Sequence, residues 1–272
     1  MPSRVSAMML TEFPVWAQIY FGVLAFIFGA CMGSFLNCAA YRVVRGESFI
    51  KGRSKCPSCG HELGIRDLFP VISWIALKGK CRYCGSRVSA RYILTETLFG
   101  LLTVICLIAF GPTLLCARNY IFICVLFVLT LTDIDDMTIP DGCHVAAVIT
   151  WAVFEPFLAS GWADAVSHIA AGLLFGGGLL AVSLAMDKAM GRDTLGGGDI
   201  KLIAVCGLYL GFIGTLFALM IACIAGLIFN SIANKSSEKG KAFPFGPWIA
   251  LGTAVMMLAG GPLIEWYGSL LI

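Results

Sequence analysis

The fold is decided by residues 125–141, which read VLFVLTLTDIDDMTIPD. The apolar part of this stretch continues a segment that begins near residue 114, so we expect a helix long enough to cross a bilayer. The helix should end near Asp133, while Pro140 and Asp141 suit the first turn of the next helix. An ionisable side chain at a membrane boundary is costly to keep charged, which makes Asp133 a candidate functional residue.

The composition indicates an integral membrane protein. Of 272 residues, 59% are hydrophobic and 13% are charged, and the mean hydropathy is +0.89, which does not describe a soluble domain. We predict an all-α fold, a polytopic membrane helix bundle of about eight transmembrane helices. One apolar stretch is divided at Gly207, Gly211 and Gly214, because a single helix of its length would overrun the bilayer. The predicted segments lie near residues 15–40, 92–111, 114–132, 142–160, 164–186, 200–213, 214–233 and 244–263.

Basic residues set the predicted orientation. Of the 19 lysines and arginines, 11 lie within residues 42–91, and three more, at 235, 239 and 241, precede the last segment. The positive-inside rule places both loops in the cytoplasm. Eight segments then put the turns at 133–141 and 187–199 on the same side. The sequence has no basic stripe with interleaved aromatic residues, so we expect membrane lipid as a partner and no nucleic acid.

A short polar segment, residues 41–91, contains two Cys-x-x-Cys pairs. Cys56 and Cys59 are separated from Cys81 and Cys84 by 21 residues, which is close to the spacing of a four-cysteine zinc site. Both pairs follow the pattern Cys-x-x-Cys-Gly, and the glycine would let the backbone turn so that its amides approach the sulfurs. Two disulfides are the alternative, but a cytoplasmic loop is kept reduced. Four thiolates leave no open coordination position, so we predict a structural zinc ion in a small cytoplasmic zinc-knuckle loop domain.

A second aspartate, Asp199, follows the glycine triplet Gly196-Gly197-Gly198 at the start of another apolar segment. Glycines without side chains would let an extended substrate approach the backbone closely. Packing of glycines between membrane helices is the alternative interpretation. Because Asp133 and Asp199 are expected on the same side of the membrane, they can form one site.

A pair of carboxylates at one membrane face can hydrolyse peptides. Two neighbouring carboxyl groups do not both ionise readily, so one can act as a base and the other as an acid. The base would take a proton from a water molecule that attacks a peptide carbonyl. Proton-coupled transport would use the same pair and stays open. His144 and His168 are isolated near helix ends, and we interpret them as polar interfacial residues.

Ordered motifs run along nearly the whole chain. Together they resemble the bacterial prepilin leader peptidases, also called type IV prepilin-like leader peptide processing enzymes, which are intramembrane aspartic proteases with a GxGD motif. The motifs are Gly33-Ser34-Phe35-Leu36-Asn37, Tyr41-Arg42, both cysteine pairs, Pro70-Val71-Ile72-Ser73-Trp74, Ser89-Ala90-Arg91-Tyr92 with Glu96, Asp133 with Pro140-Asp141, Gly196-Gly197-Gly198-Asp199-Ile200-Lys201-Leu202 and Phe243-Pro244-Phe245-Gly246-Pro247.

The resemblance implies that Asp133 and Asp199 are the catalytic pair. It further implies cleavage of the leader of type IV prepilins and pseudopilins at the cytoplasmic face of the bacterial inner membrane. Family members with the cysteine-bearing loop also methylate the new N-terminus with S-adenosylmethionine. We therefore expect both activities, with a peptidase alone as the alternative.

The expected organisation has three parts: 1–40 is the first transmembrane helix, 41–91 the four-cysteine loop domain implied in methyl transfer, and 92–272 the membrane aspartic peptidase domain. No glycine fingerprint marks a separate methyl-donor domain, so the donor-binding residues stay unassigned. The chain departs from the family pattern at Arg66-Asp67-Leu68-Phe69 and at Gly142-Cys143-His144.

Overall fold

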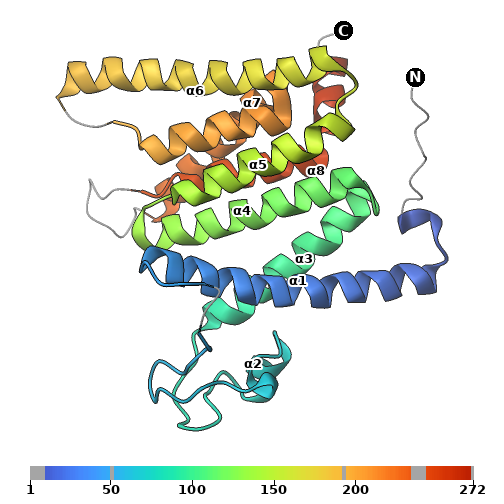
Figure 1. The fold of residues 1–272 in the computed structure, drawn as a ribbon, viewed down its shortest axis with the longest axis vertical. Coiled ribbons are helices and arrows are strands. Elements are labelled where there is room, and N and C mark those ends of the chain that lie inside the picture. The colour runs from blue at the N-terminus through green and yellow to red at the C-terminus, as the bar shows by residue number, and fades with distance from the viewer. Residues whose placement is uncertain (1–9, 50–51, 192–193, 234–242, 271–272) are drawn as a thin grey trace. The chain divides into compact units, whose positions relative to one another are not determined.

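The structure is a computed structural model that describes residues 10–49, 52–191, 194–233 and 243–270. The described residues form helices and no β-strand, which confirms the all-α prediction, and two isolated bridges pair Lys55 with Glu62 and Lys80 with Arg87. In chain order the elements are η1 (Leu10–Glu12), α1 (Val15–Val44), η2 (Ile65–Asp67), α2 (Ile72–Ala76), α3 (Ala90–Phe110), α4 (Leu114–Asp136), α5 (Asp141–Leu158), α6 (Trp162–Met190), α7 (Gly197–Ala233) and α8 (Gly246–Leu270) (Figure 1).

Six of the described helices, α1, α3, α4, α6, α7 and α8, are long and apolar enough to cross a membrane. The prediction of a multi-pass membrane protein is confirmed, but the count of eight spans is not. Every predicted segment overlaps a helix, and two features account for the difference. Helix α5 has only 18 residues and includes Glu155 and Pro156, and α7 joins the predicted segments 200–213 and 214–233 in one element.

Helix α7 is interrupted where the sequence predicted a break. Gly211 has non-helical dihedral angles, φ 65° and ψ −171°, a conformation that favours glycine because it has no Cβ. One turn earlier, the carbonyl of Leu208 accepts a hydrogen bond from Nδ1 of His168 in α6 at 2.7 Å. Only one of the three predicted glycines therefore breaks the helix, and His168 packs at this interruption.

The chain divides between Cys116 and Ala117 into two compact units, which we call unit 1 and unit 2. In unit 1, α1 packs along α3 through glycines. A Cβ added to Gly29 would lie 2.6 Å from Cβ of Thr103, and one added to Gly33 would lie 2.8 Å from Cβ of Phe99. Small residues allow such close approach, which drives helix association in lipid.

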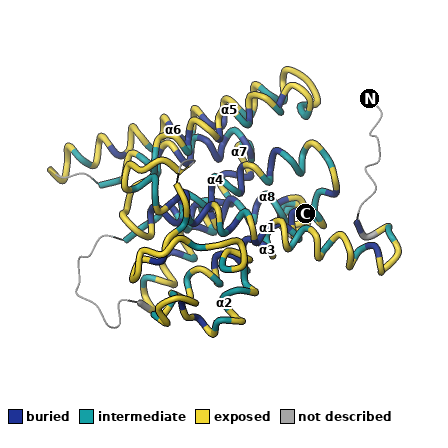
Figure 2. Tube along the Cα trace, turned by 60° about the horizontal axis from the view of Figure 1, so that its bottom comes forward, coloured by how far each residue is buried: buried dark blue, intermediate teal, exposed yellow. Residues whose placement is uncertain are grey.

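In unit 2, the buried core is built by α4, α5, α7 and α8. Phe122 of α4 stacks on Tyr209 of α7, with ring centroids 3.7 Å apart. Figure 2 colours the buried positions along these helices dark blue and the exposed ones yellow. The buried members of the cluster are Phe122, Leu126, Leu129, Ala147, Trp151, Leu202, Ile203, Val205, Cys206, Tyr209, Ala222, Ile249 and Ala250. This core holds the starts of α5, α7 and α8 in fixed register with the end of α4.

Candidate active site and candidate metal centre

Asp133 lies in the last turn of α4 and is only 5% exposed. Its Oδ2 accepts a hydrogen bond from the backbone N–H of Gly246 at 2.9 Å. Gly246 is the first residue of α8, where backbone N–H groups have no partner within the helix. The start of α8 therefore holds one oxygen of the Asp133 carboxyl group.

Ile139 brings three helix ends together. A Cβ on Gly246 would lie 2.8 Å from Oδ2 of Asp133 and 3.2 Å from Cδ1 of Ile139, and a Cβ on Gly198 would lie 3.1 Å from Cβ of Ile139. Glycine at 246 and 198 thus lets the starts of α8 and α7 approach the turn that follows α4. The glycine triplet therefore serves, at Gly198, to pack one helix start against a neighbouring side chain.

Asp199 lies in the first turn of α7, and its backbone N–H donates to the carbonyl of Gly196 at 3.0 Å. Its side chain is partly buried, whereas Gly196 and Gly197 are exposed. The carboxylates of Asp133 and Asp199 are close enough to interact electrostatically. The structure brings the two predicted aspartates together at one end of unit 2, next to an exposed stretch of glycine backbone.

His144 supports the same corner from α5. The ring, interpreted from the sequence as a polar interfacial side chain, is 7% exposed and packed inside the protein, and Nε2 lies 3.1 Å from the carbonyl oxygen of Gly198. A carbonyl only accepts hydrogen bonds, so Nε2 carries the proton. A second link joins the same two helices, from Nζ of Lys201 to Oδ1 of Asp141 at 2.6 Å. His144 follows Asp141 by three positions, so the two side chains lie on one face of α5. This spacing was the sequence feature that could have indicated that His144 belongs to this corner.

A buried ion pair lies near the opposite end of α4. Nη1 of Arg118 donates to Oε2 of Glu155 at 2.9 Å, with side chains 9% and 6% exposed. The guanidinium group also lies 5.3 Å from the ring centre of Tyr209. Arg118 precedes Asp133 by 15 residues, about 22 Å along the helix axis. This ion pair is remote from the aspartates. It contributes to the packing of α4, α5 and α7.

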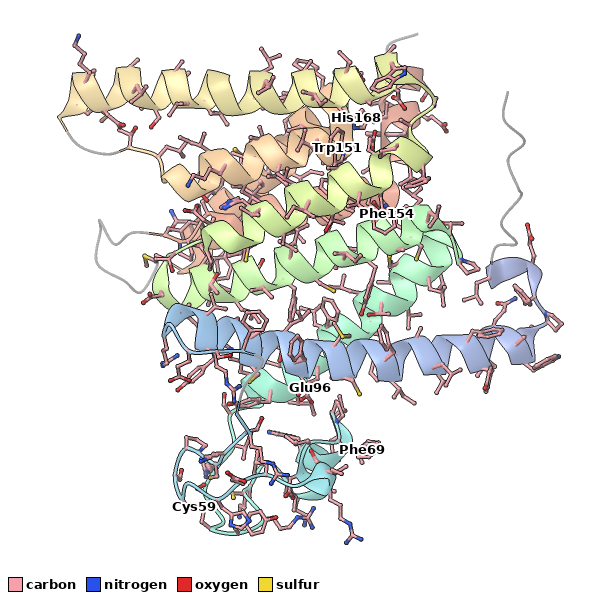
Figure 3. The ribbon with its side chains drawn as sticks, viewed as in Figure 1. Cys59, Phe69, Glu96, Trp151, Phe154 and His168 are labelled. Carbon is pink, nitrogen blue, oxygen red and sulfur yellow. The ribbon has the colours of Figure 1, made fainter. Side chains whose placement is uncertain are left out.

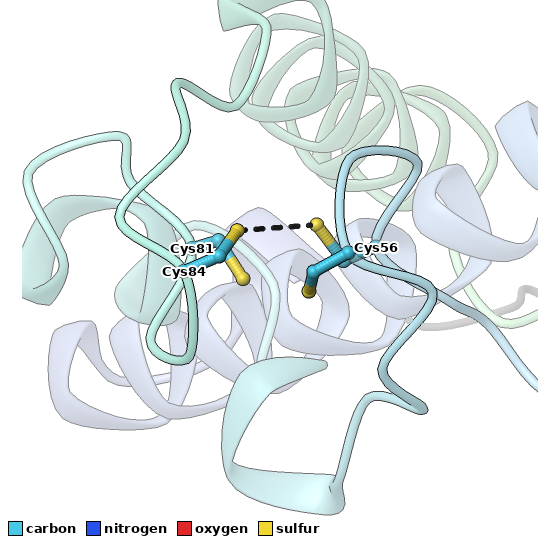
Figure 4. Close-up of side chains that lie close together, drawn as sticks. Cys56, Cys81 and Cys84 are labelled. Carbon is cyan, nitrogen blue, oxygen red and sulfur yellow. Dashed lines mark hydrogen bonds between the residues drawn. The ribbon is translucent and has the colours of Figure 1, made fainter.

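The four predicted cysteines of unit 1 come together. Their sulfur atoms all lie within 4.8 Å of one another, and Sγ of Cys56 is 3.9 Å from Sγ of Cys84. Figure 4 shows the sulfur atoms of the two loops facing each other. Four thiolates at 2.3 Å from a tetrahedral zinc ion are separated by about 3.8 Å. The residues fit a zinc ion, and none of the twelve cysteines, all of which lie within the described residues, forms a disulfide bond.

The two cysteine loops have the same local structure. The N–H of Cys56 donates to the carbonyl of His61 at 2.9 Å, and the N–H of Cys81 to that of Ser86 at 2.8 Å. Gly60 and Gly85, each after the second cysteine of a pair, have φ of 69° and 71°. This left-handed conformation favours glycine, as the repeated Cys-x-x-Cys-Gly pattern predicted.

Hydrogen bonds favour the thiolate at Cys56 and at Cys84. The backbone N–H groups of Cys59 and Ser58 lower the pKa of Cys56 to about 6. The Ser86 hydroxyl group and backbone lower the pKa of Cys84. The hydrogen bond from the backbone of His61 lowers the pKa of Cys59, but desolvation and the neighbouring sulfurs of Cys56 and Cys84 outweigh it and raise this pKa to about 11. Deprotonated sulfur is the form that binds metal, so Cys56 and Cys84 are the two sulfurs most readily available to a cation.

The fold and these two groups define a multi-pass helical membrane protein with a two-carboxylate site and a four-cysteine cluster. The model of the Bacterial Peptidase A24 N-terminal domain matches residues 27–110, and the model of the Type IV leader peptidase family matches residues 120–231. No solved structure shows a significant match to the chain.

Two relatives are similar over nearly their whole length. The prepilin leader peptidase/N-methyltransferase of Bacillus subtilis is 33% identical, with 90% of this chain and 96% of the relative covered. The protein of the same name from Aeromonas salmonicida is 30% identical, with 93% and 96% covered. The chain belongs to the type IV leader peptidase family.

Proposed function

We propose that this chain cleaves the leader of type IV prepilins and pseudopilins and then methylates the new N-terminus. The observation that carries the peptidase activity is the convergence of Asp133 and Asp199 beside the exposed backbone of Gly196 and Gly197. The methyltransferase activity rests on the four-cysteine loop and on the name shared by relatives that match nearly the whole chain.

Cleavage uses a water molecule held between the two carboxyl groups. The deprotonated aspartate takes one proton from the water as its oxygen attacks the scissile carbonyl carbon. The protonated aspartate gives its proton to the leaving nitrogen, the C–N bond breaks, and a carboxylic acid and an amine result. The N–H of Gly246 keeps Asp133 oriented through this exchange, so little reorganisation is needed in the transition state.

The place of the site at helix ends suits a prepilin. Such a substrate joins a charged leader to an apolar helix, so the helix can stay in lipid while the scissile bond lies at the interface. An extended substrate segment can approach Gly196 and Gly197, where a Cβ on Gly197 would meet nothing within 4 Å. Water can therefore reach the carboxylates without crossing the bilayer centre.

Methyl transfer requires a second reactant. S-adenosylmethionine would supply the electrophilic methyl group. The uncharged N-terminal amine would attack the methyl carbon, the S–CH3 bond would break with S-adenosylhomocysteine as the leaving group, and the amine would lose a proton. We assign no residue to the binding of S-adenosylmethionine. A zinc ion would have a structural role at Cys56, Cys59, Cys81 and Cys84, since four thiolates leave no position open for a reactant. The ion would stabilise the loop domain 41–91, which lies in the sequence between the first helix, 1–40, and the peptidase domain, 92–272.

The proposed topology has eight membrane crossings with the aspartates at the cytoplasmic face of the inner membrane. It counts α5 as one crossing and the two arms of α7 on either side of Gly211 as two. The basic loop 42–91 supports this orientation through the positive-inside rule. The basic residues at 235, 239 and 241 lie outside the described residues.

Mass spectrometry of a prepilin incubated with the purified enzyme tests the proposal. With S-adenosylmethionine, we expect loss of the leader and gain of one methyl mass; without it, loss of the leader alone. Asp133→Asn and Asp199→Asn should each lower cleavage by about 10²- to 10⁴-fold, the usual contribution of general acid–base catalysis, while the protein keeps its metal. Cleavage retained by both variants would refute the two-aspartate mechanism, and an amine left unmethylated by the wild type would leave a peptidase alone.

A further inference from the structure

An exposed apolar segment lies in the loop of unit 1. Elements η2 and α2 contact each other there, and Figure 3 shows Phe69 on the outer side of this part of the loop. The large apolar side chains of the segment are 43–82% exposed. An apolar surface of this kind in a polar loop marks an interaction site. We call it the apolar wedge, and its residues are Ile65, Leu68, Phe69, Ile72 and Ile75.

The contact of the wedge with α3 indicates its depth. The backbone N–H of Val71 donates to Oε2 of Glu96 at 2.7 Å. Glu96 is 7% exposed and lies six residues after Ala90, the first residue of α3, about 9 Å along the axis. Because α3 is one of the candidate membrane helices and the side chain of Glu96 leans toward the start of that helix, Val71 lies beside the first two turns of α3 and not beyond its end.

The packing of α1 against α3 gives an independent indication of the depth of Glu96. A Cβ on Gly33 would lie 3.3 Å from Cα of Glu96, so the two residues are at one level of the helix pair. The only charged residue of α1, Arg42, follows Gly33 by nine positions, about 13 Å along the axis. Glu96 and Val71 are therefore at a level where α1 carries no charge.

A tight turn reverses the chain at this level. Val71 has φ 62° and ψ −52°, and the N–H of Ile72 donates to the carbonyl of Pro70 at 2.6 Å. This three-residue turn is strained, above all for a β-branched residue. The hydrogen bond from Val71 to Glu96 helps to hold it. The loop thus enters and leaves on one side, with exposed Phe69 and Ile72 flanking its turn.

Exposed basic residues flank most of the wedge. Arg66 follows Ile65, and Lys78 lies three positions after Ile75. Long basic side chains can keep their charge at lipid phosphates while neighbouring apolar residues enter the acyl layer. The pattern of apolar residues between basic ones matches a phospholipid surface better than a uniformly apolar protein surface.

We propose that the apolar wedge inserts into the headgroup and upper acyl region of the membrane and holds the cysteine loops against the bilayer. The partner is phospholipid. Trp74 connects the wedge to the second cysteine loop, because its Nε1 donates to the carbonyl of Val88 at 3.3 Å, next to the bridge between Lys80 and Arg87. Insertion therefore fixes the height of the metal centre above the lipid, whatever reaction the aspartates perform.

Photocrosslinking in nanodiscs of phosphatidylethanolamine and phosphatidylglycerol tests the proposal. The crosslinking residue p-benzoyl-phenylalanine is placed singly at Ile72, at Ile75 and, as a control, at His61, which is exposed on the first cysteine loop. After irradiation, intact-mass spectrometry should show a gain of one phospholipid mass at Ile72 and Ile75 and none above background at His61.

Other products would overturn the proposal. Lipid adducts at Ile72 and Ile75 no more abundant than at His61 exclude insertion. Adducts to a second copy of the chain, to another segment of the same chain or to an added prepilin identify a protein partner instead. Each variant is first checked for monodispersity and metal content, and Ile65 replaces either position that fails.

Discussion

The cysteine cluster and the aspartate site are built in opposite ways. The four cysteines lie within residues 56–84, and each pair is shaped by hydrogen bonds inside its own loop. The aspartate site instead collects residues from four helices, and its bond from Gly246 to Asp133 joins positions 113 apart. Local chemistry therefore specifies the cysteine cluster, whereas helix packing in unit 2 creates the aspartate site. Changes at one group should leave the other intact.

Removing a metal ligand should have the largest effect on the cysteine cluster while leaving the aspartate site intact. Cys56→Ser or Cys84→Ser should release zinc, because a structural site needs all four thiolates. Methyl transfer should fall to background while leader cleavage continues. Metal analysis and mass spectrometry of the processed prepilin measure both effects, with Cys223→Ser, an exposed cysteine outside the cluster, as the control. Wild-type protein purified without zinc would contradict the assignment.

Packing at the aspartate site should be nearly as sensitive. The Cβ introduced by Gly246→Ala would lie 2.8 Å from Oδ2 of Asp133, so the carboxyl group must move. A displacement of a catalytic group by about 1 Å can lower kcat by about 10²-fold. Zinc content should not change. Gly178→Ala is the matched control because its Cβ meets nothing within 4 Å; equal cleavage by the two variants would exclude the close fit at Gly246.

His144 should act as a positioning residue for the turn before Asp199. His144→Leu removes the donor to the Gly198 carbonyl, and the loss of one buried hydrogen bond corresponds to about a tenfold lower kcat. KM should change little. His144→Gln supplies an N–H of similar reach and should recover most of kcat. If glutamine and leucine behave alike in steady-state cleavage assays, the hydrogen bond has no such role.

The smallest effect is expected in the cysteine loops. Asp67 accepts from Nε of Arg82 at 2.6 Å and from the hydroxyl group of Tyr83 at 3.0 Å. Asp67→Asn should weaken the loop by about 1 kcal/mol, since Arg82 is 45% exposed, and speed zinc release to a chelator. Glu62→Gln, in a more exposed ion pair, should have no measurable effect. Identical zinc-release rates for Asp67→Asn and Glu62→Gln would show that Asp67 stabilises the loop no more than Glu62 does.

The pH dependence of this contact has a defined sign. The hydrogen bond from Arg82 lowers the pKa of the Asp67 carboxyl group. Its contribution to stability is therefore fully present above the ordinary carboxyl pKa of about 4 and is lost as the pH falls through the lowered value. Between pH 6 and 8, the Asp67→Asn difference in zinc release should stay constant.

Several features of the fold could be predicted because they depend on neighbouring residues. Composition required membrane helices, the glycines predicted the interruption that occurs at Gly211, and the Cys-x-x-Cys-Gly repeat predicted the two equivalent loops. The number of membrane spans was harder to predict from the sequence. Hydropathy alone does not say whether an 18-residue helix with Glu155 and Pro156 inside it crosses the bilayer.

Other features depend on partners that lie far away in the sequence. His144 was interpreted as interfacial because nothing near it in the chain predicts the Gly198 carbonyl. The pairing of Arg118 with Glu155 across 37 positions and the contact of Ile139 with Gly198 and Gly246 carry no periodic signal either. Each results from which helix faces meet.

The sequence by itself determined the helical membrane class, the four candidate metal-binding cysteines and the two candidate aspartates, because residue chemistry and spacing are local properties. The tertiary structure alone decided that Gly246 donates to Asp133, that His144 holds the turn before Asp199 and that Glu96 anchors Val71 beside α3. These contacts form only when packed helices bring distant backbone and side-chain groups within hydrogen-bonding distance.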